Sequence, residues 1–240
     1  MNNCLNCGKP VSGNYCSDCG QKTIVKRYSF NNFFSDLYNS IIEFDFNYLR
    51  TFNSLLLKPG VFIKNYLFGK RRKYVSPIKY LIIILALNFA VTFFLNRPAF
   101  EPVKIYTDDK SLILNQAITL LTNIITIVLM LPFAAGIKLI NRKEDFSLME
   151  YFIFMIYIVT QAIGLYILIQ ILLKIFSIEI TENLRGISWL IVFSLMYGWG
   201  YFTFFKEKKF FFRMILSYIT GILLLIIPVY LIGIILKNMF

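Results

Sequence analysis

The chain has 240 residues, of which 58% are hydrophobic, and carries a formal net charge of +12 at neutral pH. With a mean hydropathy of +0.64, it is too apolar for an ordinary soluble domain, and the composition is typical of a polytopic membrane protein. Histidine is absent, which excludes Ser-His-Asp triads, histidine-based zinc proteases and histidine phosphorelays. The chain has only 13 carboxylates, and none lies in the middle of an apolar segment, so we expect no catalytic residues and no enzyme.

Four cysteines stand near the N-terminus in the pattern C-x2-C-x8-C-x2-C: Cys4, Cys7, Cys16 and Cys19. Each pair is followed by a glycine that tolerates a tight turn, and four thiolates complete a closed tetrahedral metal site. Residues 1–25 are therefore predicted to form a small ribbon held by a structural zinc ion, with iron as the lesser alternative. Two disulfides would be the other interpretation. The orientation predicted below places these cysteines in the reducing cytosol, which disfavours disulfides.

Residues 26–76 are predicted to form cytoplasmic or interfacial amphipathic helices that end in a basic collar. Both helices are too polar to span a bilayer, so they lie on it or pack against the protein's own helices. The first apolar stripe follows Ser29, a predicted N-cap, and comprises Phe30, Phe33, Phe34, Leu37, Tyr38, Ile41 and Ile42. The second stripe comprises Tyr48, Leu49, Phe52, Leu55 and Leu56, and it stops at Pro59.

The basic collar lies within the stretch from Lys58 to Pro77. Pro59 is suited to begin a helix because it has no amide hydrogen to leave unpaired there. The apolar and charged residues that follow suit an interfacial helix. The cations either bind anionic lipid headgroups or act only as a topogenic signal. These cations are Lys64, Lys70, Arg71, Arg72 and Lys73.

Several spaced motifs from the ribbon to Tyr80 resemble those of a known family. They are Cys19-Gly20-Gln21, Ser29-Phe30, Phe44-Asp45, Thr51, Leu55, Pro59-Gly60, Tyr66-Leu67, Gly69-Lys70-Arg71, Tyr74-Val75, Pro77 and Tyr80. The chain resembles a bacterial family of zinc-ribbon membrane proteins that is catalogued only as a domain of unknown function. The resemblance implies a cytoplasmic ribbon joined to several membrane helices, and it implies no activity.

Residues 77–240 are predicted to be a transmembrane domain, which makes the fold class all-α integral membrane. Five apolar segments are each near the ~20 residues that cross a bilayer. They run approximately over residues 78–95, 117–137, 151–173, 187–205 and 214–236.

The distribution of Lys and Arg predicts the orientation of these segments. In a five-span arrangement, 19 of them fall on the side of the N-terminus and 6 on the opposite side. Positive residues accumulate on the inner face. We therefore expect a bacterial cytoplasmic (inner) membrane protein with its N-terminus in the cytosol and its C-terminus outside.

One face of the second predicted span is polar: Asn115, Thr119, Thr122, Asn123 and Thr126. Polar side chains at membrane depth meet other helices, water or a solute. The face is either a polar path or a set of interhelical hydrogen bonds, and the second interpretation is favoured.

These patterns predict a non-enzymatic membrane adaptor or scaffold whose ribbon docks a cytosolic partner. The partners expected are the lipid bilayer and a cytosolic protein. Nucleic acid is a weaker expectation, because most of the positive charge lies on the predicted inner side, as is usual in membrane proteins. The alternative is a small transporter or channel that uses the polar face of the second span. The sequence leaves the oligomeric state open.

Overall fold

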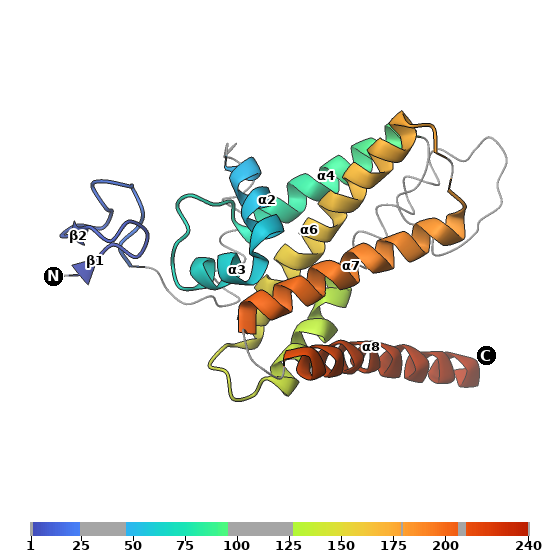
Figure 1. Ribbon diagram of the computed structural model, residues 1–240. Helices are drawn as coiled ribbons and strands as arrows, with labels where there is room; N and C mark the ends of the chain where they lie inside the picture. Colours follow the sequence, from blue (N-terminus) through green and yellow to red (C-terminus); the bar gives the residue numbers. More distant parts are fainter. Residues whose placement is uncertain (1, 25–46, 96–126, 179, 206–209, 240) are drawn as a thin grey trace.

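A computed structural model describes residues 2–24, 47–95, 127–178, 180–205 and 210–239. In this part of the chain a small N-terminal ribbon is followed by helices only. The ribbon lies at one end of the molecule, beside the short helices α2 and α3 (Figure 1). The predicted helix over residues 30–42 lies outside the described residues.

The ribbon contains a minimal antiparallel sheet. Strand β1, Asn2–Asn3, pairs with β2, Pro10–Val11, and Asn3 lies opposite Pro10 in the register. Two strands of two residues bury too little apolar surface to be stable alone. The ribbon therefore needs another source of folding free energy, which its cysteines can provide through a metal ion.

Helices α2, Tyr48–Leu57, and α3, Pro59–Leu67, are separated only by Lys58. Pro59 begins α3, as predicted. Residues Phe62, Ile63, Tyr66 and Leu67 of α3 are buried, and the helix packs against α6 and α7. The apolar face of α3 is thus covered by the protein's own helices. Of the two arrangements that the sequence allowed, this one is found, and the apolar face does not lie on lipid.

Among the described residues, three helices are long and apolar enough to cross a membrane. They are α4, Pro77–Leu95, α6, Leu148–Ile175, and α7, Glu182–Phe205. They correspond to the first, third and fourth predicted spans. The chain is therefore a membrane protein by the length and composition of its helices.

Helix α6 lies at the centre of the bundle and contacts α2, α3, α4 and α7. Nearly every residue from Met149 to Ile167 is buried. A helix that is buried on all sides is apolar all round rather than amphipathic, as this one is. It begins with a capping box in which Ser147 and Glu150 each accept a hydrogen bond from the other's backbone N–H.

Two further helices contribute to the bundle. The segment Ile127–Ile140 is helical, and α8 runs over Phe210–Met239. A Cβ on Gly136 would lie 2.7 Å from the carbonyl oxygen of Ser217 and 2.8 Å from the backbone nitrogen of Gly221. The small pair Ser217 and Gly221 therefore marks a close helix contact, as such pairs do in membrane bundles. The second predicted span begins outside the described residues.

Buried hydrogen bonds fix α2 and the start of α4 to α6. The backbone N–H of Val75 donates to Thr51 Oγ1 at 3.0 Å, and Tyr157 donates to the carbonyl of Val75 at 2.7 Å. One helical turn farther along α6, Gln161 accepts from the Tyr80 hydroxyl at 2.5 Å and donates to a carbonyl of α2 at 3.3 Å. Since unpaired polar groups are costly in such an interior, these bonds specify how the elements meet.

Thr51 offers a test of this arrangement. Its side chain is fully buried, so Thr51→Val leaves the Val75 N–H without its acceptor, and we expect a loss of about 1–3 kcal/mol. Thr51→Ser keeps the hydroxyl and should retain most of the stability. Heat-induced loss of the monodisperse protein in detergent measures both variants, and equal midpoints for the two would contradict the role of this bond.

Candidate metal centre

The ribbon consists of two copies of one turn, offset by twelve residues. In the first, Cys4 N–H donates to the Lys9 carbonyl at 2.8 Å, and Gly8 N–H donates to the Cys4 carbonyl at 2.8 Å. In the second, Cys16 N–H donates to the Gln21 carbonyl at 2.8 Å.

The second turn is completed like the first, since Gly20 N–H donates to the Cys16 carbonyl at 2.9 Å. Gly8 and Gly20 have φ angles of +79° and +68°, a region that favours glycine. The two turns therefore present two cysteines each in equivalent positions.

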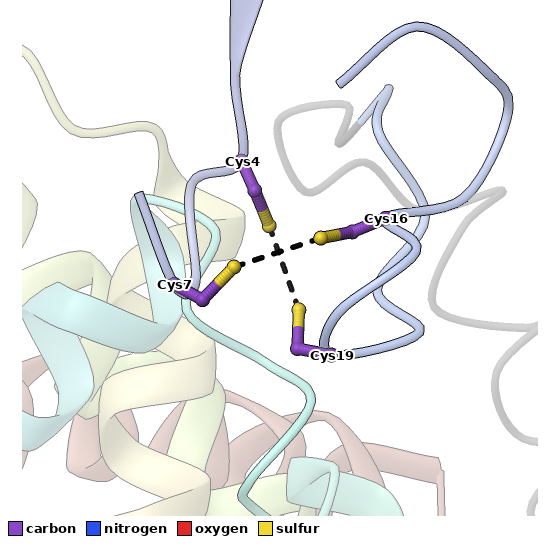
Figure 2. Close-up of side chains that lie close together, drawn as sticks. All are labelled: Cys4, Cys7, Cys16 and Cys19. Atoms are coloured by element: carbon purple, nitrogen blue, oxygen red, sulfur yellow. Dashed lines mark hydrogen bonds between the residues drawn. The ribbon is translucent and has the colours of Figure 1, made fainter. Parts of the chain in front are cut away.

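The four cysteine sulfurs converge on one point (Figure 2). All four lie within 4.8 Å of one another. The Sγ atoms of Cys4 and Cys19 are 3.6 Å apart, as are those of Cys7 and Cys16. All four cysteines are therefore unpaired in this structure, since disulfide-bonded sulfurs lie about 2.0 Å apart. Four sulfurs bound to one tetrahedral zinc ion at about 2.3 Å would lie about 3.8 Å apart, so the cluster can hold such an ion.

The donor set is closed. Cys4 and Cys16 are buried at 4% and 3% exposure, and Cys7 and Cys19 are partly exposed. With four thiolates around one ion, no coordination position remains for a substrate or a reactive water molecule. The residues therefore fit a structural metal ion and not a catalytic one.

The four thiols differ in their affinity for protons. The backbone N–H of Gln21 lowers the pKa of Cys19 to about 6. At Cys7 the N–H of Lys9 also acts to lower the pKa, but burial and the neighbouring thiols outweigh it and raise the pKa to about 12. The cluster as a whole therefore holds protons at neutral pH that a cation must displace when it binds.

Metal binding should therefore strengthen as pH rises. Because Cys7 holds its proton up to a pKa of about 12, the metal displaces at least this proton throughout the neutral range. We expect the apparent affinity to increase about tenfold for each pH unit and each displaced proton. Titration with a competing chelator between pH 6 and pH 8 measures the slope, and a slope of zero would contradict the assignment of thiols as the ligands.

The ribbon is attached to the loop after α3 through one buried side chain, Gln21, which is 5% exposed. We call residues 69–73 the basic turn. Gln21 Nε2 donates to the Gly69 carbonyl at 2.8 Å, and Gln21 Oε1 accepts from the backbone N–H groups of Arg71 and Arg72 at 3.2 and 3.3 Å. The side-chain amide thus satisfies three backbone groups of the basic turn.

Arg72 adds a second contact between the basic turn and the metal centre. Its Nε donates to the carbonyl of Cys19 at 3.3 Å. Its guanidinium lies against Gly20, where a Cβ would be 3.6 Å from Nε. The basic turn therefore touches the backbone of the second cysteine pair directly.

The five predicted lipid-binding or topogenic cations do not share one environment. Lys64 lies over the rings of Phe146 and Phe204, at 5.8 and 4.9 Å from their centroids. Arg71 lies over the Tyr66 ring at 5.6 Å. The others, Lys70, Arg72 and Lys73, are exposed. Two of the five cations thus pack on aromatic rings. A count of charges along the sequence does not reveal this packing.

The remaining site prediction lies outside the described residues. The polar face formed by Asn115, Thr119, Thr122, Asn123 and Thr126 falls in residues 96–126, so the polar-path interpretation stays a prediction. The residue that the sequence reasoning missed is Gln21. The only signal for it was its place directly after Cys19-Gly20 in the motifs of the resemblance.

Comparison with known families gives one match. Residues 47–89 are similar to a family described as "Protein of unknown function (DUF3667)". The match covers α2, α3 and the first part of α4, and it begins after the ribbon. No curated protein and no solved structure matches the chain. The chain is therefore similar, over this segment, to a domain family whose function is unknown.

Proposed function

We propose that the protein is a non-enzymatic, multi-pass inner-membrane adaptor whose metal-binding ribbon presents a docking surface to a cytosolic protein. The observation that carries this proposal is the attachment of the ribbon to the basic turn through Gln21, with three hydrogen bonds to its backbone. A ribbon attached in this way is a fixed platform at the membrane surface rather than a module on a free tether.

The outer surface of the ribbon supports a protein as the partner. Leu5, Tyr15 and Ile24 are exposed at 48%, 63% and 70%. An exposed ion pair joins Lys9 and Asp18 on the ribbon. Apolar and aromatic side chains beside a small number of charges are typical of protein interfaces, whereas nucleic-acid surfaces concentrate Lys and Arg.

Zinc is the metal that we propose for the site. A closed set of four thiolates is the usual structural zinc site, and iron is the lesser candidate because soft thiolates also bind it. When bound, the ion would cross-link the two halves of the ribbon. The chain's own residues then hold the second half against the basic turn.

A five-span topology with a cytosolic N-terminus is part of the proposal. The loop after the helix Ile127–Ile140 and the C-terminal end of α7 lie beside α3, since Phe146 contacts Phe68 and Phe204 at centroid distances of 6.0 and 5.1 Å. Segments that the Lys and Arg count assigns to the inner side therefore come together at the ribbon's end of the molecule. This placement supports the assignment of that end to the cytosol.

A paired purification from native membranes tests the adaptor function. Wild type is compared with Cys16→Ser/Cys19→Ser, which removes the metal site, and with Leu5→Ser/Tyr15→Ser, which keeps all four cysteines but changes the outer surface. We expect a protein that co-purifies with the wild type to be lost from both variants, while all three chains remain in the membrane. If both variants retained every partner of the wild type, the adaptor proposal would be wrong.

A further inference from the structure

The outer face of α2 is apolar, although no described part of the protein covers it. Thr51 and Leu55 are buried on the inner face. The opposite face follows helical spacing and is exposed; it comprises Leu49, Arg50, Asn53, Leu56 and Leu57. Leu49 and Leu57 are 78% and 68% exposed. A face with three leucines among five residues is unusual for a helix that points into water.

The contacts of α2 place it beside the first turns of α4, one of the helices long enough to cross a membrane. A Cβ on Gly164 would lie 3.4 Å from the Phe52 ring and 3.5 Å from Ile84 Cδ1, so all three residues meet. Helix α4 begins at Pro77, and Ile84 lies about 10 Å farther along its axis at ~1.5 Å per residue. Interfacial helices bury their apolar faces to about 5–10 Å, at the boundary of headgroups and acyl chains.

The cations of α2 are placed to meet lipid headgroups. Arg50 is on the exposed face, and Lys58 follows the last residue of the helix and is also exposed. Long basic side chains extend from such a depth toward the phosphates. No acidic residue occurs from Tyr48 to Lys58, so no carboxylate of this segment repels anionic lipid.

We propose that α2 is a lipid-binding element, with its leucines among the acyl chains and with Arg50 and Lys58 on the phosphate groups of anionic lipids. The bilayer is the occupant because α4, whose Ile84 meets Gly164 beside Phe52, begins near α2 and is long and apolar enough to cross a membrane. A protein partner or a second copy of the chain would have to displace lipid from the exposed side of α4. The proposal does not depend on the ribbon or on its partner.

Photocross-linking of the full chain in nanodiscs tests this proposal. A photoreactive leucine analogue is placed at position 57 in discs of phosphatidylcholine mixed with phosphatidylglycerol. Position 195 is the positive control, since Leu195 on α7 is 68% exposed. Position 15 on the ribbon, where Tyr15 is 63% exposed, is the negative control. We expect lipid adducts at position 57 in a yield similar to position 195, and none at position 15.

The headgroup preference is measured in the same adducts. We expect phosphatidylglycerol to be enriched about fivefold over its mole fraction, the effect of one cation close to an anionic surface. Arg50→Gln/Lys58→Gln should abolish the enrichment and keep the adducts. Adducts to residues 25–46, to a second copy of the chain or to another protein in place of lipid would overturn the proposal. Adducts without any enrichment would overturn the assignment of Arg50 and Lys58.

Discussion

Removal of the metal is expected to expose the peptide bonds after Arg71 and Arg72 to trypsin. A metal ion bound to the four cysteines would fix the second pair, and Gln21 follows that pair directly. We therefore expect its side-chain amide to stay on the backbone of the basic turn only while the pair is ordered. Three hydrogen bonds at roughly 1 kcal/mol each protect the turn. We expect cleavage to become at least about tenfold faster, because proteolysis follows the population of the open form.

Single substitutions distinguish the effect of losing the metal from the effect of losing the hydrogen bonds between Gln21 and the basic turn. Gln21→Ala removes the side-chain amide and keeps all four cysteines, so it should retain the metal and still show faster cleavage. Asp18→Asn breaks the exposed ion pair with Lys9, which contributes little, and should leave both metal and protection unchanged. Chelation that removes the metal but leaves cleavage at its original rate would show that the ribbon does not protect the basic turn.

Gly60→Ala is expected to disrupt the packing of α3 against α7. A Cβ at Gly60 would overlap the backbone nitrogen of Phe204 and lie 2.5 Å from the carbonyl oxygen of Gly200. Both obstructing atoms are backbone atoms, so no change of rotamer relieves the overlap. The Gly60 N–H also donates to Thr203 Oγ1 at 2.8 Å. We expect a loss of about 3 kcal/mol or more, at or above the upper end for overpacked interiors.

Gly186→Ala is the matched control. Gly186 lies in α7, and a Cβ there would meet no atom within 4 Å. The change should be neutral or slightly stabilising, because alanine favours helix more than glycine does. Thermal denaturation in detergent and the amount of protein in the membrane measure both variants. Equal stability of the two would contradict the close contact of α3 and α7.

The cysteine cluster was predictable from the sequence because its geometry is local. Two cysteines three residues apart, followed by a glycine, set the turn by themselves, and a second copy supplies the other two ligands. The four sulfurs lie close together in the structure and can hold a metal ion, as expected. The identity of the ion stays a prediction, since soft thiolates accept more than one metal.

The tertiary contacts of the ribbon and of α3 were not predictable, since they join residues far apart in the chain. Gln21 meets Gly69, 48 residues away, and Gly60 meets Thr203, 143 residues away. Sequence patterns predicted that the residues after Pro59 form a helix with apolar and charged sides. They did not reveal that α3 packs on α7 or that Lys64 lies over two aromatic rings, because periodicity does not specify what covers a face.

The most direct test of the central claim is a count of metal ions and thiols in the full chain, purified from native membranes without chelator. Elemental analysis should give one zinc ion per chain, and the four cysteines should resist alkylation until a chelator is added, after which all four should react. A chain with no metal ion and two disulfides would contradict the account of the ribbon as a metal-held platform.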